Sequence, residues 1–302
     1  MTPGAVLGLD IGGSKTHGLR AEDGGTVGEA LAGSANVASV GPAEAGRQLD
    51  VILKRLGAND IQAVCAGAAG VDTTTTEAML RGLLIERLPT AQIRVVHDTQ
   101  LILAAAGVVD GIALISGTGS VAWGRSGARC ARAGGWGYLL GDEGSGYWVA
   151  REALRRSLAR LDRGEPADRL AQRLVADCGL QSAGQLLDHF YAQPDRRYWA
   201  GRSQVVFALA RDGDPTSTRI VEEAAGALAD LAIAVAGRLG LPGPVVLAGG
   251  LAVHQPTLQE IVRRRLAQRQ LTDVRVLAVD PVCGAVELAR RLLEHHDPRE
   301  QP

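Results

Sequence analysis

The chain has 302 residues, of which 46% are hydrophobic and 22% are charged. This is the composition of a folded protein, and at roughly 150 residues per domain the length predicts about two domains. The net charge of −1 argues against a dedicated nucleic-acid-binding protein, because such proteins usually carry a basic excess. No run approaches the ~20 apolar residues that a membrane span requires, so we expect no membrane partner.

Cysteine spacing and the start of the sequence indicate the cellular compartment. The four cysteines lie far apart in the sequence, which disfavours a zinc site or a local redox pair. A secretory leader has a basic segment followed by an apolar stretch. The start of this sequence does not show that pattern. We therefore expect a reduced, cytoplasmic protein.

The first part of the chain reads as strands separated by glycine turns. Residues 6–10 form a short apolar run that ends on an acidic residue, and the chain returns through residues 17–21 after a turn at 12–16. A second turn at residues 23–25 leads into a third strand, and tight turns of this kind join antiparallel strands. Neither GxxxxGK[ST] nor GxGxxG is present and no helix follows the glycines, which excludes a P-loop and a Rossmann dinucleotide site.

Helices and strands then alternate up to about residue 106. The expected elements are a helix at 42–56, a strand at 61–66, a helix at 73–88, a strand at 93–97 and a helix at 99–106. Asp98 lies where the last strand meets the last helix. It can cap that helix, and a carboxylate at a strand end is also a suitable general base. His97 would point to the opposite face of the strand, either as a packing residue or as a residue that supports a site residue without touching the ligand.

The same order of elements restarts near residue 111. The expected elements are strands at 111–116, 121–125 and 128–133, a helix-rich stretch at 144–240, a strand at 245–247, a helix, a strand at 274–279 and a last helix at 284–295. The repetition predicts a small α/β domain of residues 1–108 plus 284–302 and a larger one of residues 109–283. Two such halves predict a cleft between them.

Glycine-rich turns occupy matching places in the two halves. Glycines let a backbone approach phosphate closely with its N–H groups turned inward, and Asp10 at a strand end is a candidate Mg²⁺ ligand, directly or through water. A third glycine loop, which also follows a buried strand, suits a flat base. Each turn taken alone is equally compatible with an ordinary turn. The residues of these three loops are Gly12, Gly13, Ser14, Lys15, Thr16, Gly117, Thr118, Gly119, Gly249 and Gly250.

Glycines and aromatic residues gather between residues 134 and 148. Aromatic residues make up only 3% of the chain, yet two tyrosines and two tryptophans fall in this stretch, together with the acidic Asp142 and Glu143. A flat indole beside backbone amides and a carboxylate is a plausible sugar-binding surface. The alternative is that the aromatic residues fill the core, which fits Trp148 better than Trp136 because Trp136 stands between glycines.

Several of these segments resemble the N-acetylglucosamine kinase group. The segments are LDIGGSKT, GSAN, VHDT, ISGTGSVAW, AGGWGYLLGDEGSGYW and LAGG. The group belongs to the superfamily of acetate kinase, sugar kinases and actin-like ATPases, and is also grouped with BadF/BadG-type ATPases. The resemblance runs from Leu7 to about Ala289. It implies two ribonuclease H-like (actin-like ATPase) domains with a central cleft, ATP and Mg²⁺ as cofactors, a homodimer, and phosphorylation of N-acetyl-D-glucosamine at its 6-hydroxyl.

The resemblance also implies roles for individual residues. Asp98 matches the base that deprotonates the 6-hydroxyl and Asp10 matches the metal-binding acid, while the three glycine loops match the ATP site. Val121 stands where animal members carry Asn, which leaves glucosamine and N-acetylmuramic acid open as alternative substrates. The residues that match the sugar site are Asn36, Asp98, Gly135, Trp136, Gly137 and Asp142.

Two other functions are possible on a similar fold. An ATPase activator of a radical dehydratase needs an iron–sulfur cluster shared between subunits, and Cys65 and Cys130 do not show that local pattern. A sugar-sensing repressor carries an N-terminal helix-turn-helix, for which there is no room before the first glycine loop. A sugar sensor that neither binds DNA nor catalyses has little support.

Overall fold

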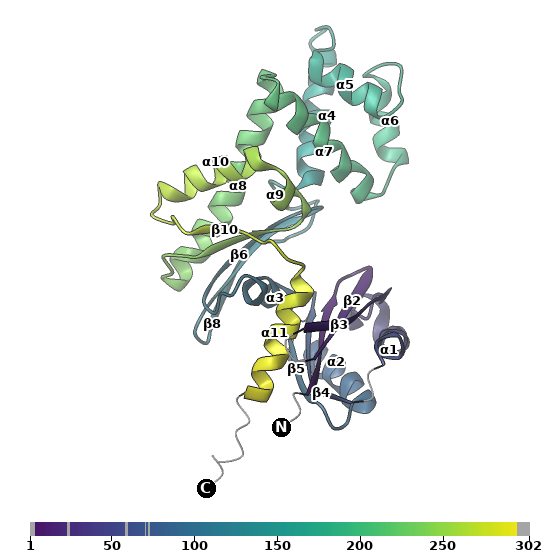
Figure 1. Ribbon diagram of the computed structural model, residues 1–302. Coiled ribbons are helices and arrows are strands. Elements are labelled where there is room, and N and C mark those ends of the chain that lie inside the picture. Colours follow the sequence, from purple (N-terminus) through teal and green to yellow (C-terminus); the bar gives the residue numbers. More distant parts are fainter. Residues whose placement is uncertain (1–3, 23–24, 58–59, 70, 72, 295–302) are drawn as a thin grey trace. The chain divides into compact units, whose positions relative to one another are not determined.

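The computed structural model describes residues 4–22, 25–57, 60–69, 71 and 73–294 (Figure 1). The chain divides into two compact units, residues 1–109 with 277–302 and residues 110–276. We call them unit 1 and unit 2 and describe each by itself. Within the described residues, no helix is both long and apolar enough to cross a membrane.

Unit 1 is built on a five-stranded sheet with the strand order β3-β2-β1-β4-β5. The strands are β1 (Ala5–Ile11), β2 (Lys15–Glu22), β3 (Gly25–Gly33), β4 (Ile61–Ala68) and β5 (Gln92–His97). The first three strands are antiparallel neighbours, as the glycine turns predict. β4 runs parallel to both β1 and β5, so the carboxyl ends of these three strands lie at one edge of the sheet.

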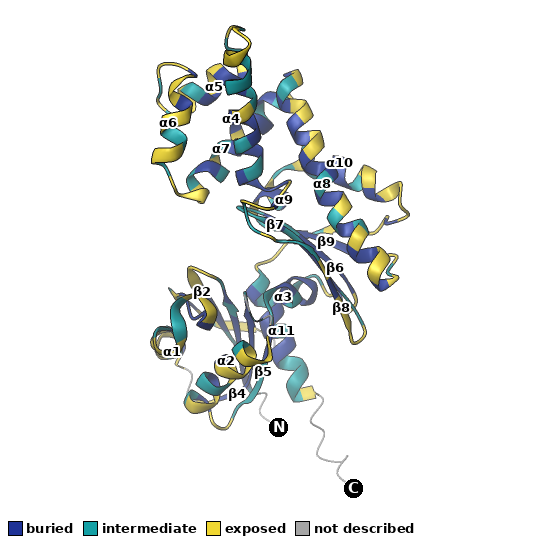
Figure 2. Cartoon of the chain, turned by 180° about the vertical axis from the view of Figure 1, so that it is seen from behind, coloured by how far each residue is buried: buried dark blue, intermediate teal, exposed yellow. Residues whose placement is uncertain are grey.

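Helices cover both faces of this sheet. They are α1 (Val37–Leu56), α2 (Thr74–Arg87), α3 (Asp98–Ala105) and α11 (Pro281–Glu294). Successive side chains of a strand point to opposite faces. Accordingly, Leu7 and Leu9 of β1 pack in a cluster with α1 and α2, whereas Val6 packs in a second cluster with α3 and α11. The strands between these helices are buried on both faces (Figure 2).

Unit 2 repeats the strand order of unit 1. Its sheet reads β8-β7-β6-β9-β10 from edge to edge, with the first three strands antiparallel and the last three parallel. The strands are β6 (Gly111–Ser116), β7 (Ser120–Ser126), β8 (Arg129–Gly134), β9 (Val245–Ala248) and β10 (Val274–Val276). The predicted restart of the meander is therefore confirmed.

The long connection between β8 and β9 is helical. The helices of unit 2 are α4 (Gly146–Asp162), α5 (Arg169–Asp177), α6 (Gln185–Ala192), α7 (Arg196–Arg211), α8 (Pro215–Leu239), α9 (Gly250–His254) and α10 (Pro256–Ala267). The largest fully buried side chains among them, Trp199 and Phe207 of α7, join the same core as the sheet residues. α8 and α10 turn their buried faces inward and their exposed faces to solvent (Figure 2).

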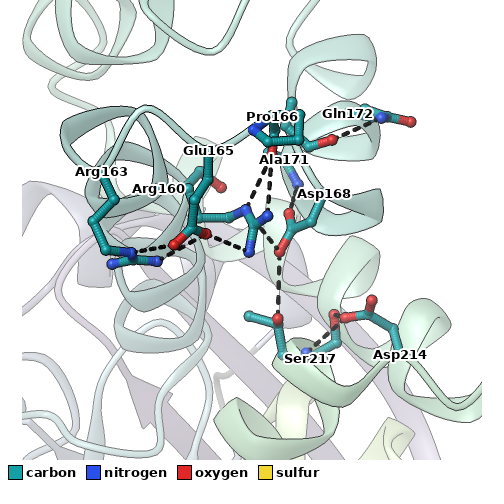
Figure 3. A network of polar contacts seen from close by, with 12 residues as sticks. Arg160, Arg163, Glu165, Pro166, Asp168, Ala171, Gln172, Asp214 and Ser217 are labelled. Carbon is teal, nitrogen blue, oxygen red and sulfur yellow. Dashed lines mark hydrogen bonds and ion pairs between the residues drawn. The ribbon is translucent and has the colours of Figure 1, made fainter.

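Polar contacts order the turns between these helices (Figure 3). Arg160 of α4 forms an ion pair of 2.9 Å with Glu165 and also approaches Asp168. Asp168 caps α5, and Asp214 caps α8 by accepting a 2.8 Å hydrogen bond from the backbone of Ser217. Because capping bonds of this kind are worth about 1 kcal/mol each, they help to fix where both helices begin.

Two helices begin or end elsewhere than predicted. The first helix starts at Val37, ahead of the expected residue 42, because Asn36 caps it and the chain continues through a kink at Gly41 with φ of 76°. The last helix starts at Pro281 instead of residue 284, and its predicted end at residue 295 lies outside the described residues. The predicted domain boundary at 284 would divide this helix, whereas the structure places the chain from Leu277 onward in unit 1.

Other differences are smaller. β10 ends at Val276 and not at residue 279. The predicted turn at residues 23–25 includes two residues that lie outside the described part of the chain. The predicted cap of α3, Asp98, is replaced by His97, whose side chain accepts a hydrogen bond from the backbone N–H of Thr99.

Candidate active site

Two carboxylates lie at the same edge of the unit 1 sheet. Asp10 is near the end of β1, and Asp98 follows β5 directly as the first residue of α3. Burial is the main cause that raises the pKa of Asp10 to about 6, and the negative charges of Asp98 and Asp280 act in the same direction. His17 and Lys15 oppose the shift without cancelling it. A group whose charged form is this disfavoured is a candidate binding site for a cation.

The Asp98 carboxylate lies against the side chain of the residue before it. The His97 Nδ1 atom lies 2.9 Å from a carboxylate oxygen of Asp98 and 2.8 Å from the hydroxyl oxygen of Thr99. The Asp98 side chain is still 33% exposed, so a ligand can reach it. With a proton on Nδ1, His97 can donate to the Asp98 carboxylate; without that proton, the same atom accepts from the Thr99 N–H and caps the helix.

The turn between β1 and β2 exposes three of its residues. The backbone N–H of Gly12 donates to the carbonyl of Lys15 at 2.9 Å, and Gly13, Ser14 and Lys15 are exposed beyond that closure. Thr16 differs from them, because it is fully buried and its hydroxyl oxygen accepts a 2.9 Å hydrogen bond from the backbone of Ala35. The structure therefore uses Thr16 to hold the turn against the next segment.

Asn36 is also engaged within the protein. Its side-chain oxygen accepts a 3.0 Å hydrogen bond from the backbone of Ala38, and its amide nitrogen donates at 2.7 Å to the carbonyl of Ala69. Only 4% of the residue is exposed. These bonds join the start of α1 to the loop after β4, at the carboxyl edge of the sheet.

In unit 2, the turn after β6 is joined to the segment GDEGS. The Ser120 hydroxyl donates at 2.7 Å to the carbonyl of Glu143, and the Ser116 hydroxyl donates at 2.8 Å to the carbonyl of Gly144. A β-carbon on Gly119 would lie 2.8 Å from a carboxylate oxygen of Asp142, so the carboxylate is against this turn. Two motifs that the sequence presents separately are therefore in direct contact.

Asp142 has an unusual backbone conformation. Its φ is 60°, in the left-handed region that non-glycine residues seldom occupy, and the residue is only 7% exposed. Such conformations cost energy and are concentrated at functional sites. The observation points to a constrained functional position for Asp142.

Beside the same turn is a cavity of about 530 Å³. Thr118 and Gly250 line it from the strand ends, and Gln204 lines it from α7. Gly249, next to Gly250, has φ of 86°, and a β-carbon there would lie 2.5 Å from the carbonyl oxygen of Ser116, so only glycine fits. The volume is in the range of small-molecule sites.

The α7 side of the cavity was missed by the sequence analysis. Arg197, Gly201 and Gln204 all line it, and they are spaced by four and three residues, which places them on one face of the helix. This helical spacing is the feature of the sequence that could have indicated a shared face. It does not indicate a ligand site, because nothing in the sequence shows that this face lies beside the glycine loop.

The aromatic stretch is partly core and partly surface. Tyr138 and Tyr147 make an edge-to-face contact with ring centroids 5.3 Å apart, and Trp148 packs against the core as predicted. Trp136 is 70% exposed, between two glycines of positive φ. An exposed indole held by a tight loop is available to a flat ligand.

Comparison with known proteins identifies the family. The family model for BadF/BadG/BcrA/BcrD ATPases matches residues 7–289. An N-acetylmuramic acid/N-acetylglucosamine kinase of Clostridium acetobutylicum is 32% identical over 301 residues, with 94% of this chain and 98% of that protein covered. An N-acetyl-D-glucosamine kinase of Dictyostelium discoideum is 30% identical over 242 residues, with 76% and 75% covered.

Solved structures show the same fold. A Porphyromonas gingivalis protein proposed to be an N-acetylglucosamine kinase superposes with a TM-score of 0.72 at 26% identity, covering 95% of this chain and 99% of that one. A ROK family glucokinase of Streptomyces griseus, solved with glucose and AMPPNP, superposes with a TM-score of 0.58 at 19% identity, covering 95% and 100%. The predicted α/β, actin-like ATPase fold is confirmed, and the chain belongs to the BadF/BadG/BcrA/BcrD ATPase family.

Proposed function

We propose that this protein transfers the γ-phosphoryl group of ATP to the 6-hydroxyl of an amino sugar, N-acetyl-D-glucosamine. The observation that carries the proposal is the Asp98 carboxylate, which is accessible, lies 2.9 Å from His97 Nδ1, and is close enough to Asp10 to influence its pKa. The family and its two curated amino-sugar kinase relatives support the same reaction class.

Asp98 is the proposed general base. Its carboxylate accepts the proton of the sugar 6-hydroxyl while the hydroxyl oxygen attacks the γ-phosphorus in line and ADP leaves. A well-placed base of this kind contributes about 10²- to 10⁴-fold to the rate. The remaining contribution comes from positioning and from neutralising charge on the phosphates, since phosphoryl transfer asks little covalent chemistry of the protein.

The cavity of unit 2 is the proposed nucleotide site. Gly117, Thr118 and Gly119 form a turn whose backbone can approach phosphate oxygens. Gly250, with open space where a β-carbon would be, is the proposed nucleoside contact, and Gly249 beside it lets the chain pass close to Ser116. In unit 1, the proposed phosphate contacts are Gly12, Gly13, Ser14 and Lys15, with Thr16 supporting the turn from within the protein.

Asp10 fits the acid that would hold Mg²⁺. Its carboxylate is largely buried near two other acidic side chains, and a divalent cation would offset both the burial and the repulsion that raise its pKa. Among the described residues, no three His, Cys, Asp or Glu side chains are grouped to bind a metal by themselves. Mg²⁺ tolerates this, because it usually takes one or two carboxylates and completes its shell with waters and phosphates. Bound there, directly or through water, it would supply positive charge to the phosphates.

The proposed sugar contacts of unit 2 are Gly135, Trp136, Gly137 and Asp142. Those of unit 1 are Asp98 and Asn36. Glucosamine and N-acetylmuramic acid remain alternative substrates. A homodimeric state and a cytoplasmic location, expected from the family resemblance and the cysteine usage, complete the proposal.

An assay of ADP release tests the reaction. Purified protein with ATP and Mg²⁺ is given N-acetylglucosamine, glucosamine, N-acetylmuramic acid or glucose, and we expect an amino sugar to stimulate ADP release. 6-Deoxy-N-acetylglucosamine is the matched control, because it lacks only the hydroxyl that reacts and should inhibit without turnover. If the 6-deoxy sugar were phosphorylated, or if no amino sugar stimulated ADP release, the proposed function would be wrong.

A further inference from the structure

An arginine lies beside the exposed tryptophan of unit 2. Arg132, on β8, donates from Nε to the carbonyl of Gly134 at 3.2 Å and from Nη2 to the carbonyl of Gly135. Its guanidinium carbon is 5.5 Å from the centre of the Trp136 ring. Two backbone carbonyls and one indole therefore hold the guanidinium against the glycine loop.

This guanidinium retains hydrogen-bonding capacity. No carboxylate forms an ion pair with Arg132 in the part of the chain that the structure describes, whereas other arginines of unit 2, such as Arg156 and Arg160, have acidic partners. Its two contacts to the loop use Nε and Nη2, and Nη1 makes no hydrogen bond to any described residue. A planar guanidinium with a free edge suits a carboxylate, which it can bind through two parallel hydrogen bonds.

The arginine also borders the proposed sugar surface. A β-carbon on Gly135 would lie 2.7 Å from Arg132 Nη2 and 3.0 Å from a methyl group of Val121, so these side chains meet over one glycine. Trp136 approaches Gly141, the residue before Asp142, since a β-carbon there would lie 3.3 Å from that of Trp136. A sugar on the Trp136 surface would therefore have a cation and a small apolar group at its edge.

We propose that Arg132 and Trp136 form a subsite for a carboxylate carried by the amino sugar, so that Arg132 lets the enzyme accept an acidic amino sugar in addition to N-acetyl-D-glucosamine. This inference rests on the proposed kinase function and adds a specificity residue to it. The indole provides the flat contact, Arg132 binds the carboxylate, and Val121 offers an apolar contact for a short alkyl substituent.

Three sugars test the subsite. N-acetylmuramic acid carries a carboxylate on a lactyl ether, its methyl ester keeps the skeleton without the charge, and N-acetylglucosamine lacks the substituent. We expect Arg132→Gln to lower kcat/KM for the acid by about 10- to 100-fold, the range for a charged hydrogen-bonded contact, and to change the values for the ester and N-acetylglucosamine less than about threefold. Because the carboxylate is remote from the reacting hydroxyl, the loss should be in KM with kcat nearly unchanged.

Two further variants give the control. Arg132→Lys keeps the positive charge but loses the planar pair of N–H donors. It should therefore retain part of the preference for the acid that Arg132→Gln loses. Arg129→Gln removes an arginine from the same strand, one that donates to the carbonyl of Leu239, and should leave all three values unchanged. The thermal unfolding of every variant is compared with that of the unmodified protein.

The outcomes separate the two proposals. Equal losses for all three sugars in Arg132→Gln, or equal turnover of acid and ester by the unmodified enzyme, would overturn the subsite while leaving the kinase function intact. Calorimetric titration with acid and ester decides the subsite without turnover. Tighter binding of the acid that disappears in Arg132→Gln supports it even if phosphorylation fails, and equal binding of the two sugars overturns it.

Discussion

The two units present different groups at equivalent places of the same sheet topology. In unit 1, the central strand β1 bears Asp10 near its end, and the turn that follows exposes Gly13, Ser14 and Lys15. In unit 2, the central strand β6 ends at the buried Ser116, whose hydroxyl donates to a backbone carbonyl. The turn after β6 then opens onto a cavity.

The shared topology determines where ligands can bind in each sheet, and the side chains at that edge determine which chemistry is possible there. Both sheets bring the ends of three parallel strands to one edge, which is where ligands bind in open α/β sheets. In unit 1 that edge holds acidic groups whose charges act on one another, as the raised pKa of Asp10 shows. In unit 2 a β-carbon on Gly250 would meet nothing within 4 Å, and the acidic Asp142 lies against the turn. The proposed function therefore places proton transfer and metal binding in unit 1 and the nucleoside in unit 2.

Asp98→Asn should have the largest effect. Asparagine has the size of aspartate but cannot accept the proton, so we expect kcat to fall about 10²- to 10⁴-fold with the fold retained. Steady-state kinetics and thermal unfolding measure the two properties. Asp110→Asn is the control from unit 2, since that carboxylate accepts a hydrogen bond from Gly127 and has no proposed role in the reaction. Near-normal turnover by Asp98→Asn would remove the proposed base.

Gly284→Ala tests how α11 is packed in unit 1. A β-carbon there would lie 2.0 Å from the carbonyl oxygen of Leu101 and 2.7 Å from the backbone nitrogen of Ala105, both in α3. The two helices must separate, so we expect a loss of about 2–4 kcal/mol in the free energy of unfolding, in the range of severe overpacking. Urea unfolding measures it. A change within experimental error would mean that the contact between α3 and α11 is looser than described.

Asp10→Asn should raise the stability of unit 1 while impairing catalysis. The pKa of Asp10 is raised from 3.8 to about 6, so the folded protein retains a proton that the unfolded chain has lost between these values. Stability therefore falls as the pH rises through this window, and the full penalty is present above about pH 6. Removing the carboxylate should add about 1–3 kcal/mol at pH 7.5 and almost nothing near pH 4.

Urea unfolding of the metal-free Asp10→Asn variant at both pH values checks this expectation. Asp50→Asn is a suitable control, because that exposed carboxylate on α1 pairs with Arg87 at the surface. An equal gain at pH 4 and pH 7.5 would contradict the electrostatic origin of the effect.

The smallest effect is expected when one helical glycine in each unit is replaced by alanine. Gly82 in α2 and Gly201 in α7 both have open space where a β-carbon would be placed. Alanine is the better helix former, so each Gly→Ala change should stabilise the protein by about 0.5–1 kcal/mol. Only Gly201 lines the cavity, so only Gly201→Ala should raise the KM for ATP. Equal KM values for the two variants would argue against nucleotide binding in this cavity.

The local pattern of the sequence determined most of the architecture. Apolar runs between glycine turns determined both strand meanders, because a tight turn forces neighbouring strands to pair. The helix after residue 73 could be predicted in the same way, since Thr73 caps it as its sequence position indicates. The motifs around Asp98 and Asp142 were sufficient to indicate the family.

Tertiary structure alone decided how those motifs are used. Thr16 and Ser14 are neighbours in one turn, yet Thr16 is buried against Ala35 while Ser14 is exposed. The raised pKa of Asp10 comes first from its burial in the fold and then from the charges of Asp98 and Asp280, which are far away in the sequence. Hydrogen bonds, cavities and electrostatic interactions connect atoms that are close in space, and the spacing of residues along one chain records such proximity only within a single helix, strand or turn.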